Sequence, residues 1–328
     1  MKIPRIVYKL VKEVRSNLTE YEHYVVAVSG GADSLVLADI CGELAMEGFA
    51  QFTICHVEHG IRGQESLDDM AFVESFCREK KLSFIGIHVD ALDFAKKNKL
   101  SVEDAARRLR YEVLYKTMQE VAASRILTAH QADDQAETVL WRLLRGAGIE
   151  GLSGMRLDNG KVARPMLNIT RKEIADYLEE KHLKHRTDST NANLNYTRNK
   201  IRQELLPYLA NNYNERIREA LSRTAKVLAE DAVCLEELAQ KEYNQVVELE
   251  EKEQFVLNAK KLAELQPAIC KRVLRYACFK FGISELDNER TQAIYKMLLR
   301  KTGNKVIQLP QEVTVTLKNN KLIFSTKF

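Results

Sequence analysis

Residues Tyr24–Ser34 read YVVAVSGGADS and carry the clearest indication of the architecture. Their first half, Tyr24–Val28, is rich in valine and predicts a buried β-strand. The pair Gly30 and Gly31 then permits a tight turn, and Leu35–Met46 continues with the apolar spacing of a helix. A glycine turn lets the backbone approach an anion, and the N-terminus of the following helix offers unpaired N–H groups to it. The stretch therefore predicts an anion-binding loop between a strand and a helix.

The same alternation of strands and helices continues to residue 167. Further strands are expected over Phe52–Val57, Phe84–Val89, Arg125–Ala129 and Val162–Leu167. Further helices are expected over Asp68–Lys80, from Ser101 onward, and over Asp134–Arg145. Strands that alternate with helices in this way build parallel sheets. We therefore expect an α/β fold with a five-stranded, Rossmann-like parallel sheet.

Three polar clusters follow strands of this expected sheet. They are Ser29–Ser34, His56–Arg62 and His130–Asp134. Parallel sheets bind their ligands outside the carboxyl ends of the strands. The three clusters are therefore expected to converge on one site.

The loop Ser29–Ser34 carries groups suited to phosphates. Its serine hydroxyls can donate hydrogen bonds, and Asp33 can bind a Mg²⁺ ion that bridges phosphates. No lysine follows the glycines, which excludes the P-loop of kinases and GTPases. The alternative is a tight turn with a Ser/Asp helix cap. The pattern Ser-Gly-Gly-x-Asp-Ser resembles the pyrophosphate loop of the N-type ATP pyrophosphatases, which cleave ATP between the α- and β-phosphates. That resemblance implies ATP binding by Ser29, Gly30, Gly31, Ala32, Asp33 and Ser34.

The second cluster resembles a signature of the tRNA(Ile)-lysidine synthetases. Val57–Arg62 reads VEHGIR and is similar to that family's Val-Asp-His-Gly-Leu-Arg, with Glu58 in place of the usual Asp. The resemblance implies that His59 and Arg62 lie near the nucleotide. Glutamate has one methylene more than aspartate, so the carboxylate at position 58 lies about a bond length away from the place where the family's Asp would hold it.

The third cluster resembles the same family over a longer run. Thr128–Thr138 is similar to the family's Ala-His-His-x-Asp-Asp-Gln-x-Glu-Thr, with Gln131 in place of the second histidine. We interpret Asp133 as the partner of Asp33 in binding Mg²⁺, which makes both candidate catalytic residues. Acidic residues in the first turn of a helix also offset its dipole, and this remains the alternative.

Two further segments of similarity carry arginines. Ala106–Tyr111 (ARRLRY) resembles the family's Ala-Arg-x-x-Arg-Tyr, and Arg107 and Arg110 lie one helical turn apart. We interpret them as catalytic groups for the α-phosphate or as contacts to the RNA backbone; a solvated basic face is the alternative. Leu144–Leu152 is similar to the family's glycine-rich segment and makes Arg145 a candidate for tRNA binding. A helix C-cap followed by a mobile loop would explain the same glycines.

Beyond residue 168 helical patterns replace strands, and the charge becomes uneven. Residues 161–226 hold 14 Lys and Arg against 8 Asp and Glu, whereas residues 227–266 hold 4 against 10. The basic part contains Thr187–Asn191 and Tyr196–Arg202, similar to the family's Asp-x-Ser-Asn and Arg-Asn-x-Ile-Arg. Arg198 and Arg202 are therefore candidates for tRNA binding, with internal ion pairs as the alternative.

The chain is expected to form two domains. Residues 1–210 would be the ATP-binding catalytic domain. Residues 211–328 would be a mainly helical accessory domain for tRNA, with a short β segment near the end. The length of 328 residues fits two domains.

Composition excludes several classes of protein. None of the six cysteines forms a Cys-x-x-Cys pair, so no zinc ribbon or iron–sulfur cluster is indicated, and buried, reduced thiols are expected. No signal peptide or membrane-spanning apolar stretch is visible, and a cytoplasmic protein is expected. The net charge of +4 argues only weakly for nucleic acid.

The resemblance implies a ligase with ATP and Mg²⁺ as cofactors and free L-lysine and tRNA(Ile) with a CAU anticodon as partners. It would adenylate the wobble cytidine and then join lysine to C2, releasing AMP and pyrophosphate. A tRNA thiolase, an amidating synthetase of the GMP or NAD type and a non-catalytic RNA-binding module are the alternatives. A homodimer is left open.

Overall fold

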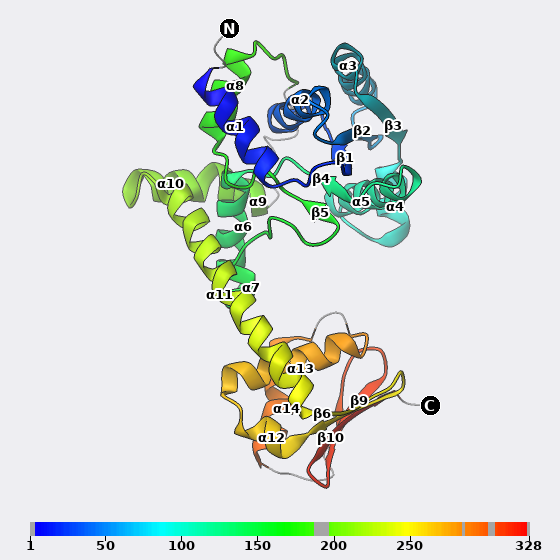
Figure 1. The fold of residues 1–328 in the computed structure, drawn as a ribbon, viewed down its shortest axis with the longest axis vertical. Helices are drawn as coiled ribbons and strands as arrows, with labels where there is room; N and C mark the ends of the chain where they lie inside the picture. Colours follow the sequence, from blue (N-terminus) through cyan, green and yellow to red (C-terminus); the bar gives the residue numbers. More distant parts are fainter. Residues whose placement is uncertain (1–3, 187–196, 284–285, 301–305, 327–328) are drawn as a thin grey trace. The chain divides into compact units, whose positions relative to one another are not determined.

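The computed structural model describes residues 4–186, 197–283, 286–300 and 306–326. The chain divides into two compact units, Met1–Ala229 and Glu230–Phe328, which are treated separately below (Figure 1). The division expected between residues 210 and 211 stays a prediction.

The first unit contains a five-stranded sheet with the order β3-β2-β1-β4-β5, and every neighbouring pair is parallel. The strands are β1 (His23–Ala27), β2 (Gln51–Glu58), β3 (Ser83–His88), β4 (Arg125–Leu127) and β5 (Val162–Ala163). The expected Rossmann-like parallel sheet is therefore confirmed. Because β2 and β4 lie on opposite sides of β1, the strand order reverses at β1, where α/β folds form their binding crevice.

Helices lie on both faces of this sheet (Figure 1). The longer ones are α1 (Arg5–Ser16), α2 (Ala32–Met46), α3 (Gln64–Lys80), α4 (Ala91–Asn98), α5 (Val102–Glu120), α6 (Ala132–Leu144) and α8 (Arg171–Glu180). Shorter segments are α7 (Ile149–Leu152), α9 (Thr197–Lys200), the π-helical turn η2 (Ile201–Leu205) and α10 (Leu206–Asn212). Helix α11 (Ile217–Val246) begins in this unit.

Strands β1 and β2 are buried on both faces, as the central strands of a doubly covered parallel sheet are, whereas the edge strand β3 has no fully buried residue. Val26 packs into the cluster formed with α1, α2 and α8, whereas its neighbour Val25 packs into the cluster formed with α5. Ile54 and Cys55 on β2 divide between the two clusters in the same way. This two-sided burial explains why the strands are continuous apolar runs without alternating polar residues.

Helix α2 begins earlier than its apolar pattern suggests. Its N-cap is Gly31, so Ala32, Asp33 and Ser34 form its first turn and do not belong to a free loop. The polar residues of this turn obscured the start of the helix in the sequence. The consequence is that the side chains of Asp33 and Ser34 have fixed positions on a helix.

The second unit is a separate α+β structure with its own core. Its sheet has the order β6-β7-β10-β9-β8, with antiparallel pairing throughout. The strands are β6 (Val247–Glu250), β7 (Gln254–Asn258), β8 (Val306–Gln308), β9 (Val313–Lys318) and β10 (Lys321–Thr326). The helices are α12 (Ala259–Glu264), α13 (Pro267–Lys280) and α14 (Asn288–Arg300). Helices and a short terminal β segment were expected; β6 and β7 were not, because they lie within the acidic segment.

Two expectations from composition can be compared with the structure. All six cysteines are free, and five are buried; Cys234 is exposed, which corrects the expectation of burial for that residue. Among the described residues, no helix is long and apolar enough to cross a membrane.

Candidate active site

The loop after β1 is closed by its own serines. The hydroxyl of Ser34 donates to the carbonyl of Gly31 (2.9 Å) and accepts from the backbone N–H of Ser29 (3.2 Å). Gly30 has a φ of +90°, a conformation that strains any residue with a Cβ. These bonds fix the turn so that the first N–H groups of α2 point outward, which suits an anion.

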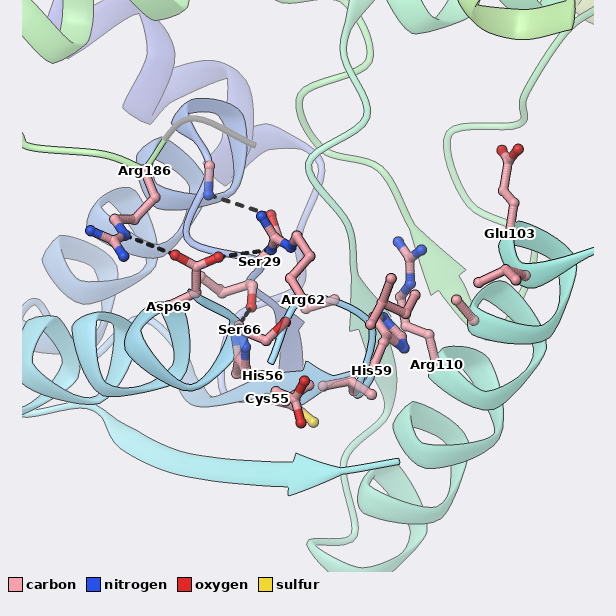
Figure 2. A pocket seen from close by; sticks show the side chains of 18 of the residues that line it. Ser29, Cys55, His56, His59, Arg62, Ser66, Asp69, Glu103, Arg110 and Arg186 are labelled. Carbon is pink, nitrogen blue, oxygen red and sulfur yellow. Dashed lines mark hydrogen bonds and ion pairs between the residues drawn. The ribbon is translucent and has the colours of Figure 1, made fainter. Parts of the chain in front are cut away.

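Beside this loop lies a cavity of about 690 Å³, within the range of nucleotide-sized ligand sites. Its walls come from the loop, the end of β2, and helices α3 and α5 (Figure 2). The lining includes Ser29, His56, His59, Arg62, Asp69 and Arg110. Two of the three predicted clusters, Ser29–Ser34 and His56–Arg62, thus share one cavity, whereas His130–Asp134 contributes no residue to its lining.

Burial lowers the pKa of both histidines that line this cavity, which favours their neutral forms. Nδ1 of His56 lies 2.9 Å from the carbonyl of Val28, so it carries the proton, and burial lowers the pKa of His56. Burial and the charge of Arg110 lower the pKa of His59 to about 4. Nδ1 of His59 is buried without a hydrogen-bond partner among the described residues, so it is available to a ligand.

Glu58, the residue that departs from the family signature, stabilises the loop after β2. Its buried carboxylate accepts from the N–H of Gly60 (2.6 Å) and pairs with His88. Burial alone would raise the pKa of Glu58, but the bonds from Gly60 and His88 together lower it. Gly60 has a φ of +69°, so Glu58 holds a turn that needs glycine.

Asp33 lies in the first turn of α2, and Asp133 lies in the first turn of α6; their joint role in binding Mg²⁺ stays a prediction. Burial, followed by the charge of Asp134, raises the pKa of Asp33 to about 6, and Asp133 adds to this effect. Burial also raises the pKa of Asp133, although Arg218 lies 3.3 Å away. A carboxylate whose pKa is raised by burial and by the charge of neighbouring carboxylates favours the approach of a cation.

The pair fits Mg²⁺ in the manner of enzymes that bind the metal with substrate phosphates. Among the described residues, no group of three or more His, Cys, Asp or Glu side chains forms a metal site. Mg²⁺ is usually held by one or two carboxylates, waters and phosphate oxygens, and two carboxylates are what Asp33 and Asp133 offer.

Asp134 and Glu137 form a second acidic group on α6. Glu137 is 2% exposed and accepts from Nε of Arg198 (3.0 Å), and Nε of Arg202 lies 3.5 Å from its other oxygen. Arg198 also donates to Asp134 (3.1 Å). The structure thus forms the internal ion pairs that were the alternative for these two arginines, and their contact with tRNA stays a prediction.

Asp134 also caps α6. Its carboxylate accepts from the backbone N–H of Gln131 (3.1 Å), and the side chain of Gln131 accepts from the N–H of Asp133 (2.8 Å). Asp134 therefore both caps helix α6 and belongs to the site. Glu137 had no assigned role in the sequence analysis, although it lies in the same motif.

The other candidate arginines lie in different places. Arg110 lines the cavity, whereas the guanidinium of Arg107 lies 5.2 Å from the ring centre of Tyr111, outside it. Arg145 is exposed and lies over the ring of Trp141 (4.7 Å). The signature Thr187–Asn191 lies outside the described residues, as does the start of the one after it.

Comparisons with known proteins agree with this geometry. Residues 3–209 match the model of the PP-loop domain, and residues 257–322 match that of the TilS substrate binding domain. The tRNA(Ile)-lysidine synthase of Caldanaerobacter subterraneus subsp. tengcongensis is 33% identical over 98% of this chain and 70% of its own length. That of Clostridium acetobutylicum is 35% identical over 92% and 65%, and that of Petrotoga mobilis 32% over 97% and 96%. The chain thus spans about two thirds of the first two relatives.

A solved structure shares the fold. The U34-tRNA thiolase NcsA from Methanococcus maripaludis superimposes with a TM-score of 0.58 and 19% identity, covering 69% of this chain and 80% of its own. At this identity the likeness supports the architecture alone.

Proposed function

This chain belongs to the tRNA(Ile)-lysidine synthase family, and on that basis we propose that it joins free L-lysine to C2 of the wobble cytidine of tRNA(Ile) with a CAU anticodon, using ATP. The observation that carries the proposal is the closed Ser29–Ser34 loop beside its cavity, with Asp33 in the first turn of α2 where burial and the charges of Asp134 and Asp133 raise its pKa. A module that only bound RNA would have no need of this arrangement.

In the first step, O2 of the cytidine attacks the α-phosphorus of ATP. A bond forms between O2 and phosphorus, the bond to the β-phosphate oxygen breaks, and pyrophosphate leaves. The loop N–H groups and the hydroxyl of Ser29 orient the phosphates, Ser34 holds the loop in shape, and Arg110 adds positive charge in the cavity. Mg²⁺ held by Asp33 and Asp133 would neutralise charge on the phosphates.

In the second step, the ε-amine of lysine attacks C2 of the adenylated cytidine, and AMP leaves. The amine must be neutral to attack, so a carboxylate nearby has to take up its proton. Asp134 and Glu137 share helix α6 with Asp133, and burial raises the pKa of Glu137, which makes it a stronger base. We place the expected proton acceptor at this acidic pair.

The proposal is tested by incubating the protein with radiolabelled lysine, ATP and bulk bacterial tRNA. We expect label in RNA only when ATP is present, with one AMP released for each lysine incorporated. A thiolase, an amidating synthetase or an RNA-binding module would incorporate no lysine. The variant Asp33→Asn serves as the matched control, since it keeps the shape of the side chain and removes its charge.

A further inference from the structure

A buried carboxylate outside the family signatures holds two arginines at the mouth of the phosphate loop. Asp69 on α3 is 5% exposed. One of its oxygens accepts from Arg62 (2.8 Å), and the other accepts from Nε of Arg186 (2.8 Å), as Figure 2 shows. Residues that are 117 positions apart are thus joined through one side chain.

This arginine pair lies directly against the glycine turn. Both arginines line the same cavity as Ser29, and the backbone N–H of Arg186 donates to the carbonyl of Gly30 (3.0 Å). A Cβ placed on Gly30 would lie 3.4 Å from Val73 of α3 and 3.9 Å from the side chain of Arg186. Helix α3 and Arg186, in the segment after α8, therefore form the wall behind the turn.

The chemistry of this arrangement matches a phosphate ligand. A guanidinium is planar and pairs with phosphate through two parallel N–H groups, but a free arginine loses much rotational freedom when it binds. A carboxylate that holds two guanidiniums in advance removes that cost from the binding step. A buried aspartate also needs charged partners to be tolerated, which keeps this geometry fixed.

We propose that Asp69 is a positioning residue that orients Arg62 and Arg186 toward the β- and γ-phosphates of ATP, the part that leaves as pyrophosphate. The inference rests on the proposed function for its ligand. It adds Arg186 to the phosphate-binding groups and assigns Asp69 a role through the arginines rather than direct contact. The competing explanation is a brace that only joins α3 to the segment after α8.

Binding measurements with Asp69→Asn separate these explanations. We expect calorimetry on the full chain to show ATP and inorganic pyrophosphate bound about tenfold more weakly, with AMP affinity changed less than about twofold. In turnover, KM for ATP should rise by a similar factor while kcat stays within about threefold. Unchanged ATP affinity, or equal losses for ATP and AMP, would overturn the proposal in favour of a brace.

Asp68→Asn is the matched control. Asp68 is exposed, neighbours Asp69 on α3 and accepts from Gln64 (2.9 Å) rather than from an arginine. The variant removes the same charge at nearly the same place, so a general electrostatic effect on ATP would appear in it as well. We expect its ATP affinity to equal that of the wild type.

Arg186→Lys keeps the test decisive if Asp69→Asn does not fold. Its side chain is 42% exposed, and lysine keeps the charge but loses the planar fork. We expect ATP to bind about fivefold more weakly and AMP to bind normally; unchanged ATP binding would contradict the role of Arg186. A wild type that binds ATP and pyrophosphate but forms no lysine-labelled RNA would refute the proposed function while leaving this inference intact.

Discussion

The carboxyl edge of the parallel sheet has two halves, one after β2 and one at α6. Both contain the same arrangement of ion pairs, but the two arrangements serve different purposes. After β2, the buried Asp69 holds Arg62 and Arg186. At α6, the buried Glu137 is held by Arg198 and Arg202. One carboxylate meets two arginines in each half, so a count of charges in the sequence does not separate them.

The surroundings of these two groups separate them. The first opens on the cavity beside the glycine turn, so its arginines serve a ligand. The second adjoins Asp33, Asp133 and Asp134, where burial, followed by the charge of Asp134, raises the pKa of Asp33 to about 6. Arg198 and Arg202 there pair with protein carboxylates and are not among the residues that line the cavity. An arginine in a basic segment therefore has to be assigned by its partners.

The largest effect is expected from a change of Asp33, which adjoins the half at α6; AMP formation should be almost abolished. We expect Asp33→Asn to lower the rate of AMP formation about a thousandfold or more, because the charge that would hold Mg²⁺ on the phosphates is lost. Asp133→Asn should act in the same direction. Near wild-type turnover of either variant at saturating Mg²⁺, measured as AMP release, would show that the two halves do not divide the work as described.

Replacing an arginine that pairs with a buried carboxylate should affect stability more than replacing an exposed arginine. Arg198→Ala leaves the buried Glu137 with one distant partner, so we expect a loss of about 2 kcal/mol in the free energy of unfolding. Arg145→Ala is the matched control, since Arg145 is exposed and contacts the ring of Trp141. We expect its stability to be unchanged.

Measuring the affinity for tRNA at several salt concentrations tests whether Arg145 and Arg198 contact tRNA. A lost phosphate contact lowers that slope by about one unit. We expect Arg145→Ala to lower the slope and Arg198→Ala to lower the melting temperature. A lowered slope with unchanged melting for Arg198→Ala would mean that it contacts tRNA and that its ion pairs are incidental.

Stability should depend on pH through Asp33. Its pKa is 3.8 in the unfolded reference and about 6 in the folded chain, so folding favours the protonated form. That stabilisation is present below about pH 4 and is lost as pH rises through about 6. We therefore expect Asp33→Asn to be more stable than the wild type at pH 7 by about 2 kcal/mol, and equal to it near pH 4. Urea unfolding of both proteins at several pH values measures the difference; a constant difference would exclude Asp33 as its source.

Much of this site could be predicted from sequence because local patterns determine it. The turn at Gly30 and Gly31 and the strand-end position of His56–Arg62 follow from chain geometry, and parallel topology then brings the clusters together. The partners of Asp69 could not be predicted. Arg186 lies 117 residues away, and no local pattern indicates that its guanidinium meets α3.

The second unit shows the same limit. Val247–Glu250 reads VELE, an alternation typical of a strand, but its acidic surroundings concealed it. β6 and β7 form a local hairpin, but the pairing of β7 with the distant β10 is decided by long-range packing rather than by local sequence.

The smallest effect is expected at Glu58, in the first half of the edge. Glu58 lines the cavity, but its carboxylate accepts from Gly60 and pairs with His88, so we expect it to hold the loop rather than to bind the phosphates. Glu58→Asp shortens the side chain, which should weaken both contacts and cost about 1 kcal/mol of stability. KM for ATP should stay within about twofold, since the cavity keeps its arginines. His88→Ala is the control, because it removes one of the same contacts from outside the cavity lining; it should reproduce part of the stability loss. A tenfold change in KM for Glu58→Asp without a fall in melting temperature would contradict this role. It would mean that Glu58 acts on the nucleotide directly rather than by holding the loop.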